Sequence, residues 1–145
     1  MLSNKDIHII QEKTKTQILH QKSLTGGDIN NLYLLETTTL PLVVKSNYLG
    51  KYPNMFEYEK KGLEKLKQTK SIQIVDTINQ INSTKSSFLI LNYIKTKPKT
   101  NKFWENFGIQ LNQLHQTQSN SFGLDTPNYI GSMHQSNKWC NTWTE

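Results

Sequence analysis

Apolar residues recur along the chain with two different periods, one typical of helices and one typical of strands. Behind Ser3, a favourable N-cap residue, isoleucines at helical spacing predict a helix over residues 3–13. Segments with alternating or β-branched apolar residues follow, and they predict three strands at residues 16–24, 31–37 and 42–45. Gly26 and Gly27 predict a turn between the first two strands, because glycine adopts positive φ angles without steric cost.

The next part of the chain carries one more helix and two more strands. Apolar positions at helical spacing among glutamates and lysines predict a helix over residues 55–68. Residues 72–81 and 86–94 have strand composition and flank a polar turn. Residues 95–100 are a polar connector, so the first compact unit is predicted to end near residue 94.

A final helix and a long irregular segment complete the pattern. Residues 102–116 have an apolar stripe at helical spacing, and we expect its aromatic members to lie in the core: Phe103, Trp104 and Phe107. Residues 119–143 are rich in Asn, Ser, Gly and aromatic side chains and are predicted to form a loop. We therefore divide the chain into residues 1–94 and residues 95–145.

Composition excludes several classes of protein. The chain has 145 residues and 34% hydrophobic content, enough for one modest core. It has no apolar run of the roughly 18 residues that a membrane-spanning helix needs, and its start lacks a secretory signal pattern. We expect a cytoplasmic protein with no membrane partner. Cys140 is the only cysteine, which excludes an internal disulfide framework and a zinc site built on paired cysteines.

The charge of the chain raises the question of a nucleic-acid partner. The formal net charge is +6, but all 17 basic residues are lysines, and most are scattered along the sequence. Arginine provides the planar forks that favour recognition of bases and phosphates, and this chain has none. We therefore interpret the lysines as a solvated surface and expect no nucleic acid as partner.

Four features stand in an order that indicates a nucleotide site. A diglycine turn joins the first two strands, the third strand ends in Lys45, and the following helix holds Glu59 fourteen residues later. Two more strands lead through Leu91-Asn92-Tyr93 into the connector. This order resembles the small lobe of a protein-kinase-like fold, where a lysine on the third strand contacts phosphates and a helix glutamate fixes that lysine. The fold class predicted is therefore α+β, with a five-stranded antiparallel sheet, helices and the start of a helical large lobe.

Several longer motifs resemble those of the fructosamine kinase (ketosamine kinase) family from Leu24 onward. The most specific are the phosphate-turn motif, the lysine strand, the glutamate helix and the late aromatic block: Gly26-Gly27-Asp28-Ile29-Asn30, Val43-Val44-Lys45-Ser46-Asn47, Met55-Phe56-Glu57-Tyr58-Glu59 and Asn128-Tyr129-Ile130-Gly131. The resemblance implies an enzyme that uses ATP and Mg²⁺ to phosphorylate a sugar hydroxyl of ketosamines, which are glycated amines or glycated protein.

The resemblance also assigns roles to residues. Five residues are expected to cover the phosphates: Gly26, Gly27, Asp28, Ile29 and Asn30. Lys45 is expected to contact them and Glu59 to orient Lys45. The backbone of Asn92, Tyr93 and Ile94 is expected to meet the adenine edge, with Leu91 behind it. Four loop residues are candidates for the acceptor site: Asn128, Tyr129, Gln135 and Asn137.

No part of the sequence matches the catalytic loop of this superfamily. That loop contains an aspartate that accepts the substrate proton and an asparagine that binds metal, and another acidic residue for Mg²⁺ follows it. We therefore expect no catalytic residue and no metal ligand in this chain, a truncated polypeptide, and little or no activity alone. Trp139 and Trp143 are expected to be exposed and to favour self-association.

Two other functions remain open from the sequence. A standalone module that binds nucleotide or a partner without catalysis fits the missing catalytic loop. A kinase of the aminoglycoside or choline type fits the order of elements, although the block at residues 128–131 argues against it.

Overall fold

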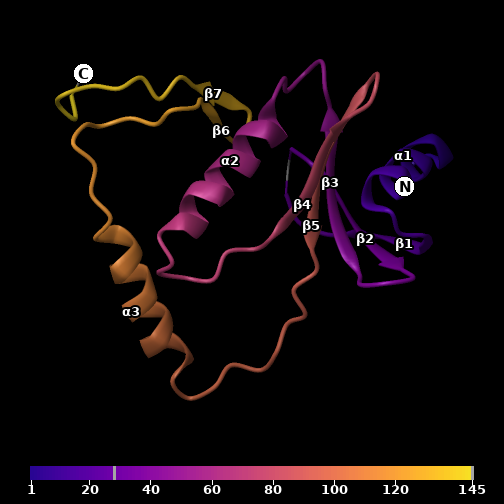
Figure 1. Cartoon of the computed structure of the whole chain (residues 1–145), viewed down its shortest axis with the longest axis horizontal. Helices are drawn as coiled ribbons and strands as arrows, with labels where there is room; N and C mark the ends of the chain where they lie inside the picture. The colour runs from indigo at the N-terminus through magenta and orange to yellow at the C-terminus, as the bar shows by residue number, and fades with distance from the viewer. Residues whose placement is uncertain (28, 145) are drawn as a thin grey trace.

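The computed structural model describes residues 1–27 and 29–144. Its centre is an antiparallel sheet of five strands: β1 (Ile18–Leu24), β2 (Asn31–Thr37), β3 (Leu42–Tyr48), β4 (Thr77–Asn82) and β5 (Ser86–Asn92). The strand order across the sheet is β1-β2-β3-β5-β4. Figure 1 shows helix α1 (Asn4–Thr14) on one side of the sheet and helix α2 (Met55–Gln68) on the other.

The N-terminal helix begins where the sequence predicts. The Ser3 hydroxyl accepts a hydrogen bond from the Asp6 N–H at 3.2 Å, and the Asp6 carboxylate accepts one from the Ser3 N–H at 3.1 Å. This reciprocal capping box satisfies amide groups that a helix start otherwise leaves unpaired. Ile10 of this helix is fully buried, which fixes α1 against the sheet.

Each face of the sheet has its own hydrophobic cluster. On the α1 face, the cluster includes Val44 of β3 and Phe88 and Ile90 of β5. On the α2 face, Phe56 of α2 packs with Leu89 of β5. Because side chains alternate between the two faces of a strand, Leu42, Val44 and Ser46 face α1, and the intervening residues of β3 face α2. This alternation decides where the polar residues of β3 lie.

Several predicted strand limits are wrong, and backbone pairing explains the largest differences. The third strand was predicted to end at Lys45, but β3 continues to Tyr48 because Ser46 and Asn47 pair with β5. The fourth strand begins at Thr77 and not at residue 72, because its pairing with β5 begins there. The fifth ends at Asn92, two residues before its predicted end. Polar residues extend a strand when a neighbouring strand satisfies their backbone groups.

The C-terminal segment differs more from the prediction. Helix α3 (Phe103–His115) is present, but none of its residues is buried, so the prediction that its aromatic stripe lies in the core is wrong here. Its three aromatic side chains contact one another instead. The predicted loop contains a short hairpin of β6 (Asn128–Ile130) and β7 (Met133–Gln135), which lies beside α2 in Figure 1.

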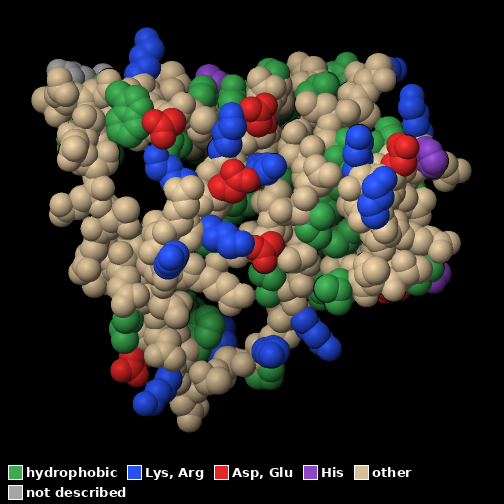
Figure 2. Space-filling model, in the orientation of Figure 1, with side chains coloured by type: hydrophobic (Ala, Val, Ile, Leu, Met, Phe, Trp, Pro, Cys, Tyr) green, Lys and Arg blue, Asp and Glu red, His purple; other side chains and the backbone are tan. Residues whose placement is uncertain are grey.

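Helix hydropathy, surface charge and exposed tryptophans bear on the expected partners. Within residues 1–27 and 29–144, no helix has the length and hydropathy needed to cross a bilayer. Figure 2 shows lysine side chains distributed among acidic side chains on the face in view, without a separate basic patch. Trp139 and Trp143 are exposed as predicted, with exposed fractions of 46% and 82%.

Candidate functional site

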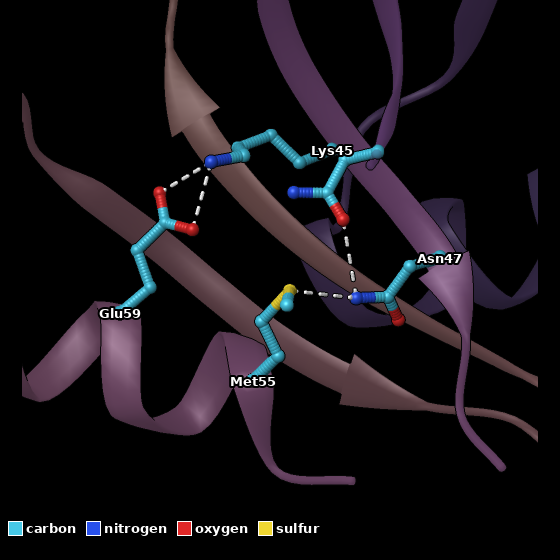
Figure 3. Close-up of polar contacts among 5 residues, drawn as sticks. Lys45, Asn47, Met55 and Glu59 are labelled. Carbon is cyan, nitrogen blue, oxygen red and sulfur yellow. Dashed lines mark hydrogen bonds and ion pairs between the residues drawn. The ribbon is translucent and has the colours of Figure 1, made fainter. Parts of the chain in front are cut away.

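An ion pair between Lys45 of β3 and Glu59 of α2 forms the centre of the site. The Lys45 Nζ lies 2.6 Å from Glu59 Oε1 and 2.7 Å from Oε2, so one ammonium contacts both carboxylate oxygens. The two side chains are 22% and 30% exposed. Figure 3 shows them reaching toward each other from the strand and the helix. The structure therefore brings together two predicted site residues that are fourteen positions apart in sequence.

The pair leaves Lys45 able to bind a further acceptor. A lysine ammonium has three hydrogen-bond donors, and two of them are directed at Glu59. The third is available for an anionic oxygen. The Lys45 ammonium lies over the ring of Phe56, with Nζ 5.9 Å from the ring centroid. Glu59 and Phe56 together restrict the side chain, so less conformational entropy remains to be lost when a ligand binds.

Two adjoining cavities meet at Lys45. Both are lined by Ile29, Asn30 and Lys45. The first, of about 380 Å³, has a mostly apolar lining that extends from the diglycine turn to the sheet: Gly27, Leu32, Val43 and Leu91. The second, of about 400 Å³, lies between α2 and the C-terminal hairpin. Their volumes lie within the range of small-molecule sites.

The diglycine turn has the backbone conformation that its sequence predicts. Gly26 has φ of 126° and Gly27 has φ of 91°, values that residues with a Cβ rarely adopt. Gly27 lines the apolar cavity. The predicted phosphate-turn residue Asp28 lies outside the described residues. Ile29 and Asn30 border both cavities.

The connector residues predicted to meet adenine are only partly placed at the cavity. Leu91 lines the apolar cavity. The Asn92 N–H donates to the Asp76 carbonyl at 3.1 Å, and the Tyr93 N–H donates to the Pro41 carbonyl at 3.3 Å. Asn92 and Tyr93 border a separate surface hollow. The side chain of Ile94 is 62% exposed.

The predicted acceptor residues separate into two pairs. Asn128 and Tyr129 line the larger cavity. The Asn128 Oδ1 is itself buried, with no hydrogen-bond donor in the described part of the chain. Gln135 and Asn137 are not among its lining residues. The Asn137 side chain donates to the Thr126 carbonyl at 3.0 Å, a bond that fixes the loop.

Tyr129 connects the hairpin to α2. Its ring stacks on Tyr58 at 6.4 Å between centroids, and its hydroxyl donates to the Pro53 carbonyl at 3.1 Å. Burial raises the pKa of this phenol, and the nearby Tyr58 adds to the effect, so the hydroxyl remains a donor at neutral pH. Sequence reasoning missed the hairpin. The available signal was Gly131, a residue type that favours hairpin turns and that has positive φ here.

A second missed residue is Asn47, which lies two positions beyond Lys45. It is only 6% exposed, and its amide nitrogen donates to Asn30 Oδ1 at 3.2 Å and to Met55 Sδ at 3.3 Å. Asn47 is the last residue of the motif Val43-Val44-Lys45-Ser46-Asn47, but the resemblance gave it no role. The predicted strand ended at residue 45 and therefore excluded it.

Magnesium would need several oxygen ligands close together. Within the described residues, no group of three or more His, Cys, Asp or Glu side chains could hold a metal ion. The site instead combines an apolar cavity with an ammonium that is anchored by Glu59.

The five-stranded sheet, the glycine turn and the Lys45–Glu59 pair define the small lobe of a kinase-like fold. The chain belongs to the fructosamine kinase family, whose model matches residues 1–145. A crystal structure of a protein from Haemophilus somnus 129PT assigned as a fructosamine-3-kinase matches with a TM-score of 0.84 and 28% identity, over 94% of this chain and 47% of that one.

Curated relatives give the same family. The chain is 37% identical over 131 residues to a probable ketoamine kinase of Vibrio parahaemolyticus. This alignment covers 88% of this chain and 44% of the relative. It is 32% identical over 141 residues to a chloroplastic protein-ribulosamine 3-kinase of Arabidopsis thaliana, with coverage of 94% and 42%. The chain thus spans about half the length of the curated relatives that it matches.

Proposed function

We propose that this chain forms the ATP-binding half of a kinase that phosphorylates a sugar hydroxyl of ketosamines, such as fructosamines and ribulosamines. The observation that carries the proposal is the two-oxygen contact between Lys45 and Glu59 where two cavities meet beside a diglycine turn. The names of the relatives, ketoamine kinase and protein-ribulosamine 3-kinase, support this class of acceptor.

The chain's own residues would bind and orient ATP, which when bound supplies the phosphoryl group. The apolar slot between Val43 and Leu91 would receive the adenine. The backbone of the diglycine turn would cover the phosphates. Lys45 would donate its third N–H to a phosphate oxygen, while Glu59 holds the ammonium in place.

The two parts of the chain would then have separate roles. Residues 1–94 would form the nucleotide-binding lobe, and residues 95–145 the connector and the first part of a second lobe. Asn128 and Tyr129 are the best-placed acceptor residues, because both line the larger cavity. An asparagine side chain carries both a donor and an acceptor, as recognition of a sugar hydroxyl requires.

Isothermal titration calorimetry of the purified chain tests nucleotide binding directly. Mg-ATP should bind at least about tenfold more tightly than AMP, because the added phosphates gain a charge-assisted bond from Lys45. The comparison with AMP is the control, since both ligands share the adenosine part. Equal affinities, or no binding of Mg-ATP, would contradict the proposal.

A second expectation concerns catalysis by these 145 residues. We propose that the groups that activate the acceptor hydroxyl lie in the part of the relatives that this chain does not span. The polypeptide mixed with Mg-ATP and fructosyl-lysine should therefore release no ADP above the rate without acceptor. A full-length relative serves as the positive control. Acceptor-dependent ADP release from the polypeptide alone would refute this assignment.

A further inference from the structure

Asn47 occupies a position where three parts of the site meet. It projects from the same face of β3 as Lys45, because side chains two residues apart share a face. Its amide nitrogen donates to Asn30, at the end of the glycine turn, and contacts the sulfur of Met55, the first residue of α2. Figure 3 shows the Asn47 side chain directed toward Met55, beside the Lys45–Glu59 pair.

Stability alone does not explain an asparagine at this position. The side chain is 6% exposed, and its Oδ1 is buried without a hydrogen-bond donor in the described part of the chain. An unpaired buried carbonyl is unfavourable, and an apolar side chain of the same size avoids that cost. Met55 and the neighbouring Phe56 already form an apolar cluster that could accommodate one. The amide therefore requires another reason.

Both partners of Asn47 border the site. Asn30 lines both cavities, and Met55 lines the larger one together with Lys45 and Glu59. Asn47 is thus connected to the turn that would cover the phosphates and to the helix that holds Glu59. A shift of either element relative to β3 breaks one of these contacts, so the amide couples the positions of the two elements.

We propose that Asn47 is a positioning residue, which holds the glycine turn and the start of α2 in register with Lys45 so that the three act together on the phosphates of the nucleotide. This inference rests on the proposed ATP site. It predicts that Asn47 affects the phosphate-dependent part of nucleotide affinity and leaves the adenosine-dependent part unchanged.

The test compares Mg-ATP and AMP binding by calorimetry in the wild-type chain and in Asn47→Leu. The variant should bind Mg-ATP about five- to tenfold more weakly, as expected for one lost orienting hydrogen bond, and should bind AMP with unchanged affinity. Its urea midpoint should be equal to or higher than that of the wild type, because the unpaired carbonyl is gone. A merely structural role predicts the opposite pattern, with lower stability and equal weakening of both ligands.

Two further variants complete the design. Thr77→Val is the matched control, because Thr77 also has a buried oxygen without a donor in the described chain but lies outside both cavities. It should leave Mg-ATP affinity unchanged. Asn30→Ala removes the other end of the bond and should weaken Mg-ATP, but not AMP, to a similar degree. If Asn47→Leu fails to fold, the Mg-ATP and AMP affinities of Asn30→Ala still test the positioning role.

The outcomes separate this inference from the proposed function. If the wild-type chain does not bind Mg-ATP, the proposed function fails and the inference fails with it. If the wild type binds Mg-ATP and both Asn47→Leu and Asn30→Ala bind it equally well, only the positioning role is overturned. A double variant that loses no more than the single variants would support a shared role, whereas fully additive losses would contradict it.

Discussion

Replacing Phe56 with alanine should lower the free energy of unfolding by about 3–5 kcal/mol, the usual range for truncating a buried phenylalanine. Phe56 has no exposed surface and packs in the cluster that joins α2 to the sheet. Its removal leaves a cavity between Met55 on the helix and Leu89 on β5. The loss is measured by urea denaturation followed by circular dichroism.

Phe103→Ala is the matched control for this prediction, because it removes the same side chain from a different environment. Phe103 lies on α3, is 38% exposed, and contacts mainly its aromatic neighbours on the same helix. The control should lower the free energy of unfolding by less than about 1 kcal/mol, the range for partly exposed positions. Similar losses for the two variants would show that α2 is not anchored through Phe56.

Phe56 also shows why part of the fold was predictable. Its helix was predicted with correct limits from periodicity, because one face of α2 packs on an apolar sheet. The capping residue Ser3 was recognised for a similar reason, since the side chain acts on its own neighbouring backbone. Features determined within a few residues of sequence can be read from that sequence.

Features determined by distant partners were not predicted. The length of β3 depends on pairing with β5, about forty residues away along the chain, where Asn47 pairs with Ser87. The burial of α3 was predicted wrongly. An apolar stripe indicates that one face of a helix can pack against another element, but it does not identify that element.

The residues of the candidate site also divide into those that the sequence predicted and those that it did not. Lys45 and Glu59 were identified together because a known order of elements relates their positions, and the structure places them in contact. Asn47 stood in a recognised motif, but its role was missed, since the sequence alone does not show which residues its side chain contacts. Its contacts with Asn30 and Met55 depend on the tertiary arrangement of three elements. Asn137 was grouped with the cavity residues, but its side chain bonds to the Thr126 carbonyl.

The partial match to longer relatives bears on how the proposed site can be tested. The match to the solved relative from Haemophilus somnus 129PT covers 94% of this chain and 47% of that one. If the chain is the ATP-binding half proposed above, binding measurements on it report on the nucleotide without phosphoryl transfer. The central lysine can then be tested by affinity alone.

Replacing Lys45 with methionine should weaken Mg-ATP binding by about ten- to a hundredfold, while AMP affinity changes less than about threefold. Methionine keeps an unbranched stem beside Phe56 but has no ammonium, so the variant removes the donor without opening a cavity. A hydrogen bond to a charged acceptor contributes about 1.5–3 kcal/mol, which corresponds to this loss of affinity. The measurement is calorimetric titration of both nucleotides.

Two comparisons decide whether the loss belongs to the Lys45–Glu59 pair. Lys61→Met is the control, because Lys61 pairs with Glu57 on the exposed side of α2 and should leave Mg-ATP affinity unchanged. Glu59→Gln removes the anchoring charge and should weaken Mg-ATP by a smaller factor. When combined with Lys45→Met it should add nothing further, because Glu59 acts on the nucleotide only through the ammonium. If Lys61→Met weakens binding as much as Lys45→Met, the effect is general electrostatic attraction and Lys45 is not the phosphate contact.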